Sequence, residues 1–203
     1  MPRRAAASWR RGSRASSSDM KLTVSPINSA LSPHLKNASR LLKSSFPKNE
    51  RISVPWLLFG ALRKNTHFTA FYDADEFVGL LYTIENAEYY FILYLAVAPQ
   101  LRCEGIGGEI LAYAYGQANG KNIVLNVEPP DPSAPNAEQR KRRIEFYARH
   151  GVHDTGYRFF DEGDEYAVLA SDTASFDNES YQKFLGGSSS TNKNGKAHDD
   201  KGV

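Results

Sequence analysis

Arg102 and three closely spaced glycines form the segment of this chain with the clearest chemical potential. Gly105, Gly107 and Gly108 follow an apolar run and directly precede a stretch with helical periodicity. The first amides of a helix have no intrahelical partners, and together with the helix dipole they attract anions such as phosphate. Glycine has no Cβ, so a ligand can approach the backbone, and the planar guanidinium of Arg102 suits phosphate oxygens. The segment therefore predicts a phosphate-binding turn.

Spacing separates the known phosphate-binding patterns. A P-loop needs Gly, four residues and then Gly-Lys-Ser/Thr, and the chain has no such run. The dinucleotide fingerprint needs a third glycine where this chain has Ile110, and no suitable strand-end carboxylate follows about twenty residues later. Both patterns are excluded by their spacing. A simpler alternative is that the glycines only permit a tight strand-to-helix turn.

Two motifs resemble those of the GNAT superfamily of N-acetyltransferases. Residues 102–107 (Arg-Cys-Glu-Gly-Ile-Gly) resemble the family's Arg/Gln-x-x-Gly-x-Gly/Ala signature. Residues 146–152 (Phe-Tyr-Ala-Arg-His-Gly-Val) resemble its Phe/Leu-Tyr-x-x-x-Gly-Phe segment, with Val152 in place of the commoner phenylalanine. The resemblance implies direct transfer of an acetyl group from acetyl-CoA to a primary amine of a small molecule or peptide. A catalytically degenerate CoA-binding or interaction module of the same fold is the alternative.

The resemblance also implies a cofactor-binding set. The strand before the glycine turn would bind the pantetheine and the thioester carbonyl through its main chain, and the turn amides would hold the pyrophosphate. The implied residues are Leu95, Ala96, Val97, Arg102, Cys103, Glu104, Gly105, Ile106, Gly107 and Gly108.

Catalytic roles follow in the same way. Tyr147 would protonate the departing thiolate, although it could instead be a tyrosine packed against the helix before it. Glu128 is the candidate general base because it closes the strand that would splay from the cofactor strand; Glu85 and water are alternatives. Strand periodicity places Tyr90 and Tyr94 on one face, where they would line the acceptor pocket.

Three other features have competing interpretations. The basic run 140–143 could be a solvated helix face, a nucleic-acid patch or a contact to the 3′-phosphate of CoA. Arg140 occupies the position where many family members have asparagine, and the nearest asparagine is Asn136. Cys103 has no histidine near it in sequence, so a role as nucleophile is not favoured.

The elements expected around these residues form an α/β layer arrangement, a GNAT-like fold with a mixed, mostly antiparallel twisted sheet flanked by helices. Strands are predicted at 21–24, 67–72, 76–85, 88–97, 122–128, 157–160 and 165–169. Helices are predicted from 33 to the residue before Pro47, from 54 to about 63, from 105 to about 118 and from 137 to 150. The second of these is so apolar that it should be mostly buried or should line a pocket.

The ends of the chain differ from its middle. Residues 1–19 contain five arginines, several serines and one acid, and we expect them to form a disordered leader upstream of a functional start at Met20. The same composition also resembles a transit peptide, which is the alternative. Residues 186–203 are rich in Gly, Ser, Asn, Lys and Asp, and they should form a disordered tail. The domain itself is therefore expected at 20–185.

Composition limits the partners. The two ends hold more net positive charge than the whole chain's +2, so the domain is acidic and nucleic acid is not an expected partner. One cysteine excludes an internal disulfide, and neither zinc spacing nor an apolar run of membrane-spanning length is present. We expect a cytoplasmic enzyme without a metal, whose partners are acetyl-CoA, the acceptor amine and, in a homodimer, a second copy.

Overall fold

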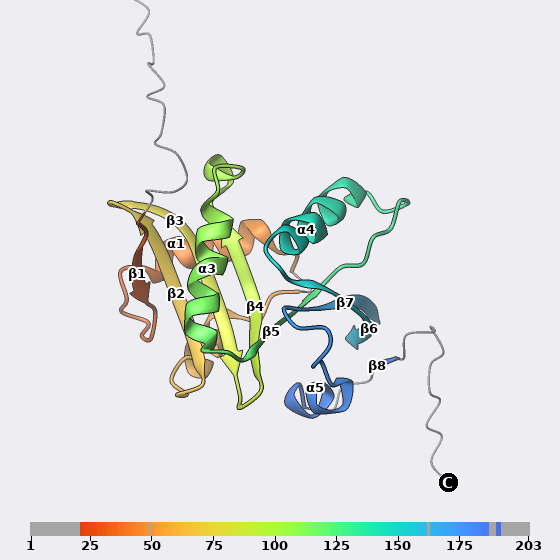
Figure 1. The fold of residues 1–203 in the computed structure, drawn as a ribbon. Helices are drawn as coiled ribbons and strands as arrows, with labels where there is room; N and C mark the ends of the chain where they lie inside the picture. Colours follow the sequence, from red (N-terminus) through yellow and green to blue (C-terminus); the bar gives the residue numbers. More distant parts are fainter. Residues whose placement is uncertain (1–20, 49, 162, 187–189, 192–203) are drawn as a thin grey trace, which may run out of the picture.

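One mixed β-sheet with helices on both faces forms the protein (Figure 1). The computed structural model describes residues 21–48, 50–161, 163–186 and 190–191. The sheet order is β1-β2-β3-β4-β5-β7-β6-β8, and all neighbours run antiparallel except the parallel pair β4 and β5. The strands are β1 (Thr23–Pro26), β2 (Thr66–Asp73), β3 (Glu76–Glu85), β4 (Tyr89–Val97), β5 (Asn122–Val127), β6 (His153–Asp161), β7 (Asp164–Ala170) and β8 (Ser190–Thr191). The predicted fold class is confirmed.

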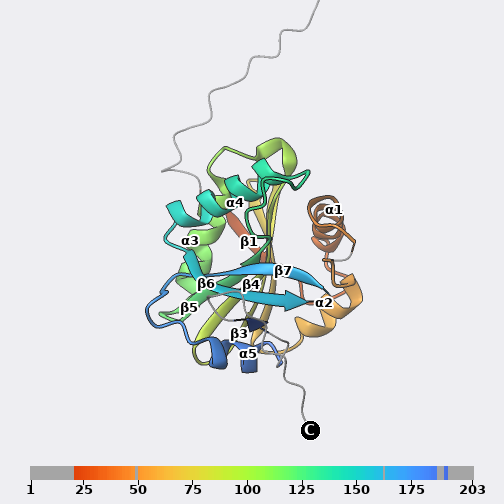
Figure 2. The same ribbon diagram turned by 90° about the vertical axis from the view of Figure 1, so that its right-hand side faces the viewer.

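The helices divide between the two faces of the sheet. Figure 2 shows α1 (Leu35–Ser45) and α2 (Val54–Gly60) on one side, with α3 (Ile106–Ala118) and α4 (Ala137–Arg149) on the other. A short α5 (Asn178–Phe184) packs against the β5–β7 half, where Tyr181 is buried among aromatic rings. No helix was predicted there. Among the described residues, no helix is both long and apolar enough to cross a bilayer.

The apolar periodicity of α1 and α3 explains their packing. Ala38, Leu41 and Leu42 of α1 are buried against β2–β4, as their spacing predicts. The predicted inner face of α3 is also buried, and its residues are Ile106, Ile110, Leu111 and Ala114. These two helices clamp the central strands and so fix the position of the turn that precedes α3.

Helix α2 contradicts the expectation of burial. Only Leu57 is buried, at 1% exposure, whereas Trp56 is 68% and Phe59 56% exposed. Leu62, which follows the end of the helix, is 70% exposed. The helix ends at Gly60 and is one layer from the sheet, so one stripe of side chains suffices to fill the space beneath it. The composition of this segment predicts a large apolar surface, but it does not indicate which side of the helix packs against the sheet.

The chain ends bear on the predicted domain limits. The expected leader at 1–19 lies outside the described residues, as does most of the expected tail. Within that tail, Ser190–Thr191 pair with Arg158 and Phe159 of β6, so these two residues are part of the sheet. The expected limits of the domain and the tail stay a prediction.

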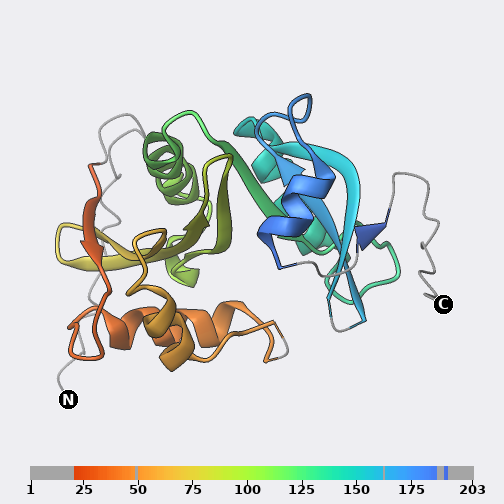
Figure 3. The same ribbon diagram turned by 90° about the horizontal axis from the view of Figure 1, so that it is seen from below.

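Strands β4 and β5 separate along their length, and this separation creates the site. They pair only at Tyr89↔Asn122, Tyr90↔Ile123 and Phe91↔Val124. Seen from below in Figure 3, the sheet divides into a β1–β4 half and a β5–β7 half. Beyond Phe91 the β4 edge facing β5 has no strand partner among the described residues, so alternate amides and carbonyls along it are available to a ligand.

Candidate active site

A cleft of about 1520 Å³ lies where β4 and β5 separate. Its walls come from the end of β4, the glycine turn, α4, the β6–β7 hairpin and the segment between α1 and α2. Of the ten predicted cofactor residues, eight line it: Leu95, Ala96, Val97, Arg102, Cys103, Gly105, Gly107 and Gly108. Glu104 and Ile106 do not line it, and the side chain of Ile106 is fully buried in the core. The structure therefore brings most of the set together.

The glycine turn has the backbone of an anion site. Cys103 has φ 68° and Gly105 has φ 85°, both in the left-handed region, and Gly105 is the N-cap of α3. The carbonyl of Gly105 accepts hydrogen bonds from the amides of Gly108 (2.9 Å) and Glu109 (3.2 Å). The preceding amides, of Ile106 and Gly107, stand at positions where a helix offers no internal partner. Gly107 itself lines the cleft.

Two glycines of the turn also serve helix packing. A Cβ on Gly107 would lie 3.2 Å from Cζ of Phe146, and one on Gly108 would lie 2.7 Å from Nε2 of His150. His150 donates from Nδ1 to the carbonyl of Phe146 at 2.8 Å, which directs its other nitrogen toward α3. His150 was missed in the sequence, where only its place inside the second motif could have pointed to it.

Arg102 links the turn to the rest of the cleft. Its Nε donates to the carbonyl of Val97 at 3.3 Å, and its Nη2 lies 3.5 Å from the hydroxyl of Ser45. The side chain is exposed, so its remaining donors are available to an anion. This geometry fits the predicted phosphate contact.

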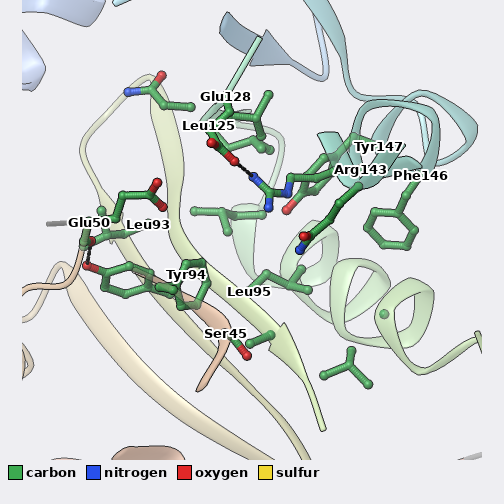
Figure 4. A pocket seen from close by; sticks show the side chains of 18 of the residues that line it. Ser45, Glu50, Leu93, Tyr94, Leu95, Leu125, Glu128, Arg143, Phe146 and Tyr147 are labelled. Carbon is green, nitrogen blue, oxygen red and sulfur yellow. Dashed lines mark hydrogen bonds and ion pairs between the residues drawn. The ribbon is translucent and has the colours of Figure 1, made fainter. Parts of the chain in front are cut away.

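Tyr147 lies on α4 and borders both the core and the cleft. It is 7% exposed, and burial raises the pKa of its hydroxyl to about 12, although the positive charge of Arg143 lowers it. Figure 4 shows the Tyr147 ring and the Arg143 guanidinium extending from α4 into the same part of the cleft. A phenol with this pKa stays protonated at neutral pH, as an acid requires. Its role as the acid stays a prediction.

Glu128 is engaged by a network that counts against its predicted role as base. Its carboxylate forms ion pairs with Arg140 at 2.7 Å and Arg143 at 3.2 Å (Figure 4 draws the latter). The amide nitrogen of Asn136 donates to both carboxylate oxygens, and its oxygen accepts from Arg140 Nε at 2.8 Å. Protonating this carboxylate would weaken charge-assisted bonds on both of its oxygens. These contacts engage the side chain of Asn136, which is the asparagine nearest to the position where many family members have one.

Glu85 lies outside the cleft and is also paired. Burial raises its pKa, but hydrogen bonds from Lys121 and His67 outweigh this effect and hold it below the ordinary value. It is therefore a strand-end carboxylate in an ion-pair cluster away from the cleft.

The prediction that Tyr90 and Tyr94 share a face is wrong because β4 contains a bulge. Pairing with β3 passes from Tyr82↔Tyr94 directly to Thr83↔Ile92, which leaves Leu93 as the extra residue. Tyr94 consequently packs with α1 and α2 and lines the cleft. Tyr90 packs on the α3 side, where its hydroxyl accepts from Thr83 at 3.1 Å.

Glu50, between α1 and α2, is the functional candidate that the sequence did not reveal. It lines the cleft and is half-buried, and burial raises the pKa of its carboxyl above the ordinary glutamate value. The negative charges of Glu128 and Asp164 raise this pKa further, whereas Arg143 and Arg140 oppose the shift. Glu50 belongs to no motif, and only the tertiary fold places it opposite α4.

Comparison with known proteins agrees with this geometry. Residues 63–153 match the family model described as "Acetyltransferase (GNAT) domain". Comparison with curated protein sequences gives no match.

Solved structures show the same fold. A GNAT-family protein from Bacteroides thetaiotaomicron is 28% identical, with a TM-score of 0.61 over 80% of this chain and 93% of that one. The aminoglycoside 6′-N-acetyltransferase from Enterococcus faecium is 16% identical, with a TM-score of 0.56 over 77% and 99%. Arabidopsis thaliana Naa50, in complex with the bisubstrate analogue CoA-Ac-MVNAL, is 18% identical, with a TM-score of 0.54 over 73% and 97%. The chain therefore has the GNAT fold, and residues 63–153 of it match the GNAT acetyltransferase domain.

Proposed function

We propose that this protein is an acetyl-CoA-dependent N-acetyltransferase whose acceptor is a primary amine of a small molecule or peptide. The observation that carries the proposal is that one cleft is bordered both by the glycine turn before α3 and by the unpaired edge of β4. The first suits a pyrophosphate, and the second suits the amides of a pantetheine arm. Acetyl-CoA joins these two chemical parts in one molecule.

Acetyl-CoA would lie in the cleft from the glycine turn to the β4 edge. The amides at the start of α3 and the Arg102 side chain hold the pyrophosphate, and the main chain of Leu95–Val97 holds the pantetheine and the thioester carbonyl. Arg142 lines the cleft from the exposed side of α4 and is the candidate for the 3′-phosphate, although it also pairs with Glu138 at 3.3 Å. The amine then attacks the thioester directly, and no covalent enzyme intermediate forms.

Tyr147 is the proposed acid for the leaving group. The bond between the carbonyl carbon and sulfur breaks, and the phenol proton passes to the thiolate of CoA. Arg143 stabilises the negative charge that develops on the phenol oxygen, because it lowers the Tyr147 pKa in the free protein. Burial has the opposite effect on the Tyr147 pKa, so we expect Tyr147 to make a moderate contribution to the rate.

The names of two related structures support both acceptor classes. The Enterococcus faecium enzyme acts, by its name, on an aminoglycoside, and the Naa50 structure contains CoA joined to a peptide sequence. The cleft here is open to either because its acceptor side is formed by the α1–α2 segment and the β6–β7 hairpin. We therefore keep both classes in the proposal.

Two measurements test the function. Calorimetry with acetyl-CoA should show saturable binding, and thiol release should exceed the no-amine rate for at least one amine in a panel. Suitable probes are butylamine, putrescine, tyramine and a tetrapeptide with a free amino terminus. Binding without turnover on any amine would favour the degenerate CoA-binding module, and absence of binding would refute both.

A further inference from the structure

We propose that Glu50 is the general base of the acetyl transfer and that Tyr94 is the residue that positions it. The inference rests on the proposed function, and it assigns to Glu50 the role that the sequence suggested for Glu128. Its starting point is the geometry of the segment between α1 and α2, which forms the cleft wall opposite α4 (Figure 4).

Tyr94 fixes this segment to the central strand. Its hydroxyl donates to the backbone carbonyl of Glu50 at 2.8 Å and accepts from the amide of Ile52 at 2.9 Å. The ring is 4% exposed and packs against Phe46 with centroids 4.8 Å apart. One buried hydroxyl therefore holds the backbone on both sides of Arg51. Because Tyr94 directly precedes Leu95, these two hydrogen bonds connect the Glu50 backbone to the strand that would bind the thioester.

The carboxylate of Glu50 points into the cleft and is available to accept a proton. Figure 4 shows it pointing toward the space bounded by Glu128 and Arg143. In the described part of the chain it takes part in no ion pair, whereas Glu128 has two. A base needs a free lone pair at the reacting atom, so the two glutamates divide the work: Glu128 holds α4 in place and Glu50 receives the proton.

The surroundings make Glu50 a stronger base than an ordinary glutamate. Burial is the largest cause of its raised pKa, followed by the charge of Glu128. A base is most effective when its pKa approaches the working pH. The titratable and charged groups that face it are Arg51, Tyr94, Glu128, Arg140, Arg143, Asp164 and Tyr166.

The proton balance of the reaction follows. The acceptor enters as an ammonium ion and gives one proton to the Glu50 carboxylate, which leaves a neutral amine. The amine nitrogen forms a bond to the thioester carbon, the carbon–sulfur bond breaks, and the thiolate takes a proton from Tyr147. The second amine proton leaves from the amide nitrogen and restores the Tyr147 phenol through solvent. Glu50 then releases its proton to water.

Glu50→Gln is the decisive variant, because it keeps the shape and removes the base. We expect kcat at neutral pH to fall by roughly 10² to 10⁴-fold, with calorimetric affinity for acetyl-CoA within about twofold of the parent. Raising the pH should recover part of the rate, since the amine then deprotonates in solution. Glu50→Asp should lie between the two proteins.

The outcomes separate this inference from the proposed function. A parent protein that acetylates none of the panel amines would end the proposed function. A parent that is active, with Glu50→Gln equally fast in single-turnover experiments at neutral pH, would overturn only the assignment of Glu50.

Tyr94→Phe tests the positioning role. Removing only the hydroxyl should lower kcat about tenfold or more, and the Glu50→Gln/Tyr94→Phe double variant should be no slower than Glu50→Gln alone. A purely structural role would instead slow the double variant further. The matched control is Tyr82→Phe, because the Tyr82 hydroxyl also donates to a backbone carbonyl, that of Leu57 at 2.9 Å, but does not line the cleft. Its kcat should match the parent's.

Discussion

Gly107 at the start of α3 faces the aromatic ring of Phe146 on α4, and a Cβ at Gly107 would lie 3.2 Å and 3.3 Å from two ring carbons. The next nearest atom is a methyl carbon of Val97 at 3.7 Å. The glycine of the phosphate turn is thus also the residue that lets the second motif pack against the first. One small residue thus permits both the proposed approach of the pyrophosphate and the contact between the two helices.

Gly107→Val should weaken CoA binding at least tenfold, which corresponds to ~1.4 kcal/mol. The added methyl groups would push Phe146 and Val97 apart and narrow the approach of the pyrophosphate to the helix amides. Calorimetry with CoA measures the loss. Unchanged affinity in a folded Gly107→Val protein would contradict the assignment of the turn.

Gly116→Ala is the control on the same helix. No atom lies within 4 Å of a Cβ at Gly116, so alanine meets open space there. CoA affinity should not change, and thermal stability should rise slightly because alanine favours a helix interior by up to about 1 kcal/mol over glycine. A loss of CoA binding in this variant would mean that α3 responds to any substitution, and the Gly107 result would then say nothing about the turn.

Local patterns explain what could be predicted from the sequence. The limits of β3 and the inner face of α3 follow from periodicity over neighbouring residues, and the glycine turn is contained in a few consecutive positions. The contact between Phe146 and Gly107, which brings the two motifs together, was not predicted from the sequence.

Long-range relationships explain what could not be predicted. The bulge at Leu93 moves Tyr94 to the face opposite Tyr90, and no residue type in β4 marks it. Glu50 becomes a candidate only when Tyr94, 44 positions away, holds its backbone at the cleft. The ion pairs of Glu128 likewise depend on the position of α4, which follows a proline-rich loop without periodicity.

Tyr147→Phe should reduce turnover by roughly tenfold to 10²-fold, the low end for acid catalysis, because a thiolate is a fairly good leaving group. CoA affinity should not change, since the ring and its packing against Phe146 remain. The Tyr147 pKa of about 12 keeps the acid protonated, so the rate ratio to the parent should stay constant from about pH 6 to about pH 10. A chemical step as fast as the parent's, measured in single turnover, would leave Tyr147 as a packing residue and solvent as the acid.

Leu57 and Trp56 form a matched pair on α2 that tests which side of this helix is packed. Leu57→Ala should lower the free energy of unfolding by about 2 to 5 kcal/mol, because its side chain is 1% exposed. Trp56→Ser should change it by no more than about 0.5 kcal/mol, because most of the ring already contacts water. Urea unfolding of both variants gives the comparison. Equal losses would mean that Trp56 is covered in solution, for example by a second copy of the chain.

Glu50→Gln should raise thermal stability at pH 7 to 8 while it removes activity. The folded-state pKa of Glu50 lies above the unfolded value, so folding favours the protonated carboxyl. This cost is absent below the unfolded pKa, grows as the pH rises toward the folded pKa, and is fully present above it. Glutamine does not ionise, so the variant's gain in melting temperature should be largest at neutral and higher pH and should shrink toward about pH 4. Melting curves of parent and variant across this range measure the difference. A variant that is less stable than the parent at pH 8 would show that the ionised carboxylate is stabilised by its surroundings, which is incompatible with a base held ready to accept a proton.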